Sequence, residues 1–170
     1  NLSKIDKKII FFKQKFFCYK LNLIYTSMPW WGTKACKKKY FKSPQWLRSI
    51  KNKKYPLWRV DVLFSEKKYN NVHIVEEGGW HFTNLRDAED LEKKLLNFLH
   101  HIDYEHSGLD KNDLKRLIDE KRVMYKHKVD SKRDEHDKWG EVEKLKKIEP
   151  EKMPKYIFNN FEKYKKWLDV

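Results

Sequence analysis

The sequence predicts an α/β fold in which a few strands come first and three helices follow. Before residue 76, apolar residues recur at every second position in three segments, while after residue 87 they recur at every third or fourth position. Aromatic residues make up 15% of the chain, which indicates a packed core. At 170 residues the chain is expected to form a single domain, residues 1–170.

Three segments carry the pattern of a strand. Residues 16–25 alternate between large apolar residues and polar ones, which predicts one strand. Residues 57–64 alternate in the same way. The inward face of this second strand is expected to carry Trp58, Val60, Val62 and Phe64. Residues 72–75, with the sequence VHIV, form a third and shorter strand after a polar turn.

Helix signals follow from local chemistry. Ser43 and Pro44 predict the start of a short helix, because serine caps helix N-termini and proline suits the first helical position. Residues 88–99 predict an amphipathic helix that ends near the two histidines after it, and residues 110–122 predict another, capped by its first aspartate. Pro154 begins the last helix. Its apolar stripe is Ile157, Phe161, Tyr164 and Leu168.

Charge and cysteine usage set broad limits on function. The net charge of +14 favours polyanionic partners, although a solvated lysine surface would give the same value. No apolar run approaches the ~20 residues of a membrane span, so we expect the chain in the cytoplasm, either free or associated with a membrane surface. Cys18 and Cys36 form no C-x-x-C pair, and the sequence allows two free thiols or one disulfide.

Residues 76–82, EEGGWHF, contain two adjacent glycines in a chain that has five. Gly78 and Gly79 permit positive φ angles and close backbone approach, and they directly follow the last predicted strand. Ligands of open α/β sheets bind at this edge, where Trp80 would stack on a ring and His81 would bind a metal ion or a phosphate oxygen. A tight turn with a core tryptophan and a surface histidine would produce the same spacing.

Titratable residues gather at the predicted end of the first long helix. They are His100, His101, Asp103, Glu105 and His106. Their functional interpretation is metal ligation or acid–base chemistry. The alternative is helix termination, because histidines suit the negative end of the helix dipole.

A loop before the first predicted helix presents aromatic rings and basic groups. Trp30 and Trp31, with Lys34, would form a platform for a sugar or base, or would pack against the sheet. Residues 37–46, KKKYFKSPQW, interleave lysines with aromatics as single-strand nucleic-acid grooves do. A basic nucleic-acid-binding module is therefore the alternative function, although no nucleic-acid partner is favoured over a sugar donor.

Several blocks of sequence together resemble glycosyltransferase family 17, the family of β-1,4-mannosyl-glycoprotein β-1,4-N-acetylglucosaminyltransferases. The blocks are FFCYKLNLIYTSMPWWGTKACKKKYF, EEGGWHFTNL, NFLHH, KWG and MPKYIFNNFEKYKKWLD. They occur in the family's order across nearly the whole chain.

The resemblance implies a GT-A-like nucleotide-diphospho-sugar transferase fold. It implies an inverting enzyme that moves a sugar, N-acetylglucosamine by this likeness, from a UDP-sugar donor to a glycan acceptor with the help of a divalent cation, Mn²⁺ or Mg²⁺. The family's D-x-D metal motif does not occur in this sequence. We therefore expect the chain to be the carboxy-terminal portion of the family domain, with the nucleotide-binding amino-terminal half apparently absent.

The resemblance also implies roles for individual residues. His81 would be a catalytic residue and a late metal ligand, and His100 matches a second family histidine. The catalytic base stays open among Asp103, Glu77 and Glu76. The residues that would bind donor or acceptor are Gly78, Gly79, Trp80, Trp30, Trp31 and Lys34.

Overall fold

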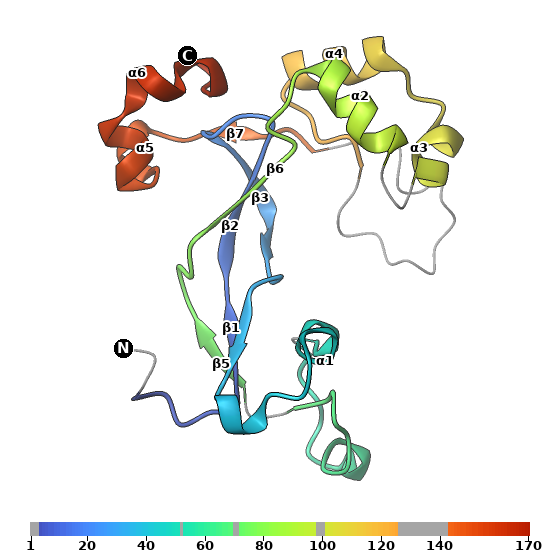
Figure 1. The fold of residues 1–170 in the computed structure, drawn as a ribbon, viewed down its shortest axis with the longest axis vertical. Helices are drawn as coiled ribbons and strands as arrows, with labels where there is room; N and C mark the ends of the chain where they lie inside the picture. The colour runs from blue at the N-terminus through green and yellow to red at the C-terminus, as the bar shows by residue number, and fades with distance from the viewer. Residues whose placement is uncertain (1–3, 52, 70–71, 98–100, 126–142) are drawn as a thin grey trace. The chain divides into compact units, whose positions relative to one another are not determined.

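The computed structural model describes residues 4–51, 53–69, 72–97, 101–125 and 143–170. The chain divides into two compact units. Unit 1 comprises Asn1–Lys15 and Pro29–Gly79, and unit 2 comprises Phe16–Met28 and Trp80–Val170. Each unit combines strands with short helices, so the predicted α/β class is confirmed at this general level (Figure 1).

Unit 1 contains a three-stranded sheet with the order β4-β1-β5. The central strand β1 (Ile9–Phe12) pairs antiparallel with β4 (Lys34–Cys36) and parallel with β5 (Val72–Val75), the strand predicted at residues 72–75. One face of β1 is fully buried against α1 (Pro44–Ser49). The core cluster there consists of Ile9, Phe11, Trp46 and Ile50.

The start of α1 follows the predicted capping chemistry. Ser43 Oγ accepts a hydrogen bond from the Trp46 backbone N–H at 3.1 Å, and Pro44 is the first helical residue. The Trp46 indole N–H donates to the Glu66 carbonyl at 2.7 Å, so the buried ring leaves no polar atom unpaired. A short 3₁₀ helix, η2 (Lys38–Tyr40), precedes α1.

The strand predicted at residues 57–64 is wrong. This segment is a turn followed by a 3₁₀ helix, η3 (Val60–Val62), and only Val62 of the expected inward face is buried. Its N–H groups bond within the segment, as in Val62 N–H to the Arg59 carbonyl at 3.1 Å. Alternating apolar residues mark a strand only when a sheet face covers them, and here Trp58 and Phe64 are exposed.

A four-stranded sheet belongs mainly to unit 2 and has the order β6-β2-β3-β7. Its strands are β6 (Trp80–Thr83), β2 (Gln14–Cys18), β3 (Leu23–Trp30) and β7 (Lys146–Lys147). The single strand predicted over residues 16–25 is wrong, since a tight turn separates β2 from β3. Tyr19, with φ of 65°, begins this turn, and both it and Leu21 are buried, so the apolar alternation continues through the break.

Three helices follow β6 in unit 2. α2 (Ala88–Leu96) starts at Asp87 and ends before the predicted histidines, and α3 (His101–Ser107) is a separate helix that the sequence pattern did not predict. α4 (Lys111–Asp119) begins with the predicted cap: Asp110 and Asp113 form a reciprocal capping box. α2 packs against α3 and α4.

The carboxy-terminal segment forms short helices instead of one. After η5 (Pro150–Lys152) come α5 (Lys155–Asn159), α6 (Phe161–Tyr164) and η6 (Lys165–Trp167). The predicted helix is interrupted at Asn160, where φ is −122°. The predicted stripe still packs inward, because Ile157 and Leu168 are buried together with Leu21.

Asn22 anchors the carboxy terminus to the β2–β3 turn. Its side-chain N–H donates to the Asp169 carbonyl at 2.9 Å, and its oxygen accepts from the Asp169 N–H at 2.8 Å. Asn22→Ala should lower the free energy of unfolding by about 1.5 kcal/mol, because it leaves the partly buried backbone N–H and carbonyl of Asp169 without these hydrogen bonds. Urea denaturation measures the loss. Asn112→Ala, which alters a surface contact to Asp110, is the control and should change stability by less than about 0.5 kcal/mol.

Candidate functional site

The predicted site residues divide between the two units. Those in unit 1 are Trp30, Trp31, Lys34, Glu76, Glu77, Gly78 and Gly79. Those in unit 2 are Trp80, His81 and Asp103, while His100 lies outside the described residues.

The two glycines build a corner that no other residue would fit. A Cβ on Gly78 would lie 2.7 Å from Phe12 Cβ and 2.9 Å from Phe12 Cα. Gly79 has φ of 120°, which strains any residue with a side chain. Backbone bonds hold the corner against the chain after β1: Gly78 N–H donates to Lys13 at 2.8 Å, and Lys15 N–H donates to Gly79 at 2.9 Å. The prediction of close backbone approach is thus confirmed for Gly78.

Trp80 and His81 begin β6 in unit 2. Trp80 is 40% exposed, so part of the residue is accessible to a ligand. The His81 imidazole is half-buried, and its ring centre lies 5.4 Å from that of Phe16. Burial lowers the pKa of His81 below its ordinary value, so the imidazole is neutral at pH 7. A neutral imidazole can accept a proton from a hydroxyl or bind a cation.

The two tryptophans and the lysine where β3 leads into β4 make contacts within unit 1. Trp31 packs edge-on against Phe11 at 6.4 Å, as part of the core of unit 1. The Trp30 ring covers Gly32, where a Cβ would lie 2.2 Å from the indole nitrogen. The ammonium of Lys34 donates to the carbonyls of Arg48 and Ile50 at the end of α1, and burial lowers its pKa. Packing against the sheet, the alternative left open for these residues, therefore describes Trp31, while the ammonium of Lys34 binds the end of α1.

The candidate bases differ in their surroundings. Glu76 forms an ion pair with Lys13 at 2.8 Å, and Glu77 lies 3.9 Å from Lys15. Glu77 also adopts a positive φ of 50° in the turn that leads to the glycines. Asp103 lies in the first turn of α3 in unit 2 and is half-buried.

The described part of the chain shows no cluster of side chains that would form a site for the expected divalent cation. In that part, no three His, Cys, Asp or Glu side chains come together as a metal site requires. His81 supplies one imidazole, which alone is a poor ligand set for Mg²⁺ or Mn²⁺.

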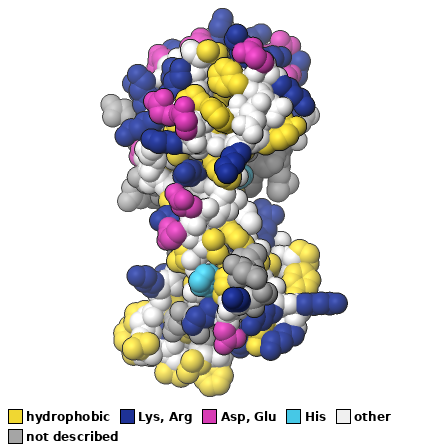
Figure 2. Space-filling model, turned by 90° about the vertical axis from the view of Figure 1, so that its left-hand side faces the viewer, with side chains coloured by type: hydrophobic (Ala, Val, Ile, Leu, Met, Phe, Trp, Pro, Cys, Tyr) yellow, Lys and Arg dark blue, Asp and Glu magenta, His cyan; other side chains and the backbone are white. Residues whose placement is uncertain are grey.

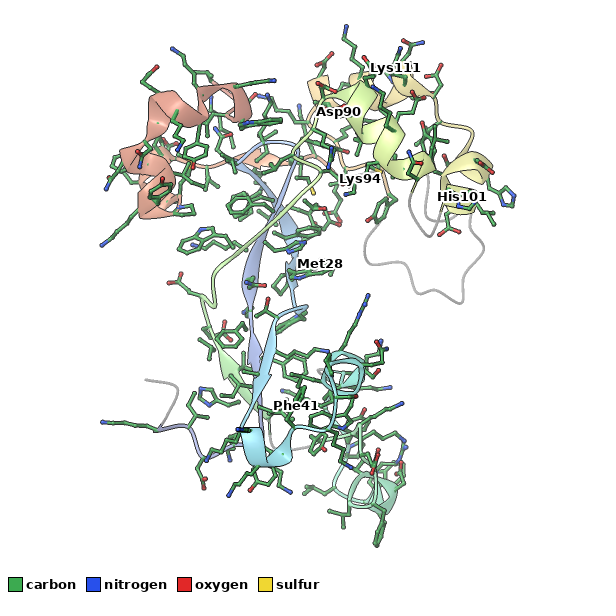
Figure 3. The ribbon with its side chains drawn as sticks, viewed as in Figure 1. Met28, Phe41, Asp90, Lys94, His101 and Lys111 are labelled. Atoms are coloured by element: carbon green, nitrogen blue, oxygen red, sulfur yellow. The ribbon has the colours of Figure 1, made fainter. Side chains whose placement is uncertain are left out.

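Lys94 is a cation that the sequence pattern did not reveal. It lies on α2 (labelled in Figure 3), and its ammonium donates to Asn84 Oδ1 at 2.7 Å. Asn84 ends the EEGGWHFTNL block and has a positive φ of 53°. Burial, then the charge of Arg86, lowers the pKa of Lys94. The signal was present in the sequence as a lysine among the apolar positions of an amphipathic helix.

An open cavity of about 750 Å³ lies in unit 1. Its lining carries lysines and aromatic rings, with two carboxylates among them: Lys8, Lys37, Lys39, Tyr40, Phe41 and Lys42 contribute, together with Trp46, Phe64, Tyr69, Asp6 and Glu66. Lys39 and Lys8 lie over the Tyr40 ring, at 4.9 Å and 5.2 Å from its centre. Five of these residues belong to the KKKYFK run, and Phe41 among them is labelled in Figure 3.

The two cysteines of the chain are both free thiols. Cys18 is buried and Cys36 half-buried, both are free, and burial raises the pKa of Cys18 to about 12. Neither thiol is therefore an activated nucleophile. Among the described residues, no helix is both long enough and apolar enough to cross a bilayer.

Comparison of the chain with protein-family models, curated proteins and solved structures found no match.

Proposed function

We propose that the chain is part of an inverting glycosyltransferase of GT-A-like fold, which moves a sugar from a UDP-sugar to a glycan hydroxyl. N-acetylglucosamine is the sugar that the resemblance to family 17 favours. One observation carries the proposal: a half-buried histidine, whose pKa burial lowers, directly follows an exposed tryptophan in the chain at the start of β6. Both residues lie in the EEGGWHFTNL block, which carries much of the resemblance.

The chemistry of sugar transfer gives each group a role. The acceptor hydroxyl must lose a proton as it attacks, and the neutral His81 can accept it. The Trp80 ring offers an apolar face for a pyranose ring. Negative charge develops on the departing diphosphate, and the half-buried ammonium of Lys94 is a donor in the same unit that can stabilise it.

A direct assay tests the proposal. The full product of the gene that encodes this chain is incubated with UDP-N-acetylglucosamine, an N-glycan acceptor and Mn²⁺ or Mg²⁺, and released UDP is measured. Acceptor-dependent release of UDP is expected. A folded protein that releases no UDP from this donor or from a panel of other UDP-hexoses would refute the proposal.

Nucleic-acid binding is the second candidate, and the lysine-lined cavity of unit 1 favours it. Bases would stack on the Tyr40 ring while Lys8 and Lys39 contact phosphates. A gel shift with a single-stranded oligonucleotide at low salt is the test. Lys39→Ala combined with Tyr40→Ala should weaken binding, while the matched pair Lys163→Ala and Tyr164→Ala, also a lysine over a ring, should not. Equal losses of oligonucleotide affinity in the two double variants would show that binding depends on net charge alone and not on the cavity.

A further inference from the structure

The segment around η3 exposes an unusual amount of apolar surface. Five large side chains there keep between 59% and 96% of their surface exposed. We call them the 57–64 patch: Leu57, Trp58, Val60, Leu63 and Phe64. Figure 2 shows hydrophobic side chains gathered at the lower end of the view, with lysine and arginine side chains nearby. Contiguous exposed patches of this kind mark surfaces that contact a partner or a membrane.

Lysines flank the patch on both sides along the chain. Residues 51–68 contain six basic and two acidic residues. Both acids are neutralised: Asp61 pairs with Arg59 at 2.6 Å and with Lys68 at 2.8 Å, and Glu66 pairs with Lys42. The remaining lysines pair with no carboxylate among the described residues. They are Lys51, Lys53, Lys54 and Lys67.

Several backbone N–H groups of the patch are already hydrogen-bonded within the segment. The N–H groups of Arg59, Val62 and Leu63 donate to carbonyls three residues earlier, at 3.0 to 3.1 Å. The segment can therefore leave water without exposing these donors to hydrocarbon. Val62 is buried and holds the segment against the rest of unit 1.

We propose that the 57–64 patch docks unit 1 onto an anionic membrane surface, with the apolar side chains in the interface and the flanking lysines on lipid phosphates. Trp58 suits this depth, because tryptophan favours the boundary between headgroups and acyl chains. The lysines can extend toward the headgroups while their stems stay in apolar surroundings.

Charge argues against the other occupants of the patch. A second copy of this chain would bring the same lysines together, and the whole chain already carries +14. Nucleic acid would match the lysines but gains nothing from aliphatic side chains such as Leu57 and Val60. An anionic bilayer matches both the apolar side chains and the lysines.

Vesicle flotation of the full chain tests the proposal. Vesicles of phosphatidylcholine with phosphatidylserine should carry the protein, and pure phosphatidylcholine vesicles should carry much less. The combined variant Trp58→Ser, Leu63→Ser and Phe64→Ser should lower the partition coefficient by at least about tenfold, since it removes three apolar side chains that would insert into the membrane interface. A matched variant at exposed apolar positions of unit 2, Ile102→Ser, Tyr156→Ser and Phe158→Ser, should bind like the wild type.

A second readout places the patch in the bilayer. Brominated lipids should quench the fluorescence of the wild type more than that of Trp58→Phe, which keeps the apolar ring. Three results would overturn the proposal. They are absence of binding to the anionic vesicles, unchanged binding by the triple serine variant, and light scattering that shows a dimer which only that variant abolishes. Binding that an oligonucleotide displaces and the serine variant retains would assign the surface to nucleic acid instead.

Discussion

Gly78→Ala is expected to destabilise unit 1 by about 3 kcal/mol, the upper range for overpacking a closed site. The added methyl would lie 2.7 Å from Phe12 Cβ and 2.9 Å from Phe12 Cα. A flexible side chain could move away from such a contact, but the second atom belongs to the backbone of β1. Relief therefore requires β1 to shift, although its other face is packed in the core. Chemical denaturation followed by circular dichroism measures the loss.

Gly108→Ala separates lack of space from backbone strain. Gly108 has φ of 69°, but a Cβ there would meet nothing within 4 Å. Its replacement should therefore cost only the conformational term, about 1 kcal/mol. Gly78 is not among the residues with positive φ, so its cost is one of space alone. Equal effects of the two substitutions would contradict the close contact between Gly78 and β1.

Elements set by local chemistry could be predicted from the sequence. The starts of α1 and α4 each depend on a side chain within three residues of the N–H it caps, and both caps form as expected. The strand at residues 72–75 was also predicted, although its register beside β1 was not. These features depend on neighbours in the sequence, which a single chain displays directly.

Elements decided by tertiary surroundings could not be predicted. Alternation over residues 57–64 suggested a strand, but that segment bonds to itself and turns its apolar side chains outward. The turn after β2 was hidden because its residues Tyr19 and Leu21 are themselves buried. Alternation reports which side chains are apolar, and both cases show that it does not report what covers them.

The candidate site was predictable to the same extent. The paired glycines predicted a tight corner in the chain. In the structure, Gly78 lies so close to Phe12 that a Cβ would not fit. The hydrogen-bond partners of Lys34 could not be predicted, because the carbonyl that accepts from its ammonium lies at the end of a helix, 14 residues further along the chain. Lys94 was missed, since its partner Asn84 is reached only when α2 folds back toward the end of β6.

His81→Ala is the prediction that bears most directly on function. In the proposed reaction, the His81 imidazole takes the proton from the hydroxyl of the acceptor glycan. Removing the imidazole should therefore lower kcat/KM for UDP-sugar transfer by about 100-fold or more. Stability should change by only about 1 kcal/mol, because the ring is only half-buried. Burial lowers the pKa of His81 below the ordinary histidine value, so the wild-type rate should fall on the acid side at a lower pH than an exposed histidine would give.

His73→Ala is the matched control, since His73 is also half-buried on a short strand but lies in β5 of unit 1. It should keep the wild-type rate and its pH profile. Steady-state UDP release, measured from pH 5 to 8 for all three proteins, separates the outcomes. Full activity of His81→Ala would remove this imidazole from the reaction. If His81→Ala loses both its activity and the circular dichroism signal of the folded protein, the role of His81 is in packing. A residue that only accepts a proton from a half-exposed position can be deleted without unfolding the sheet that carries it.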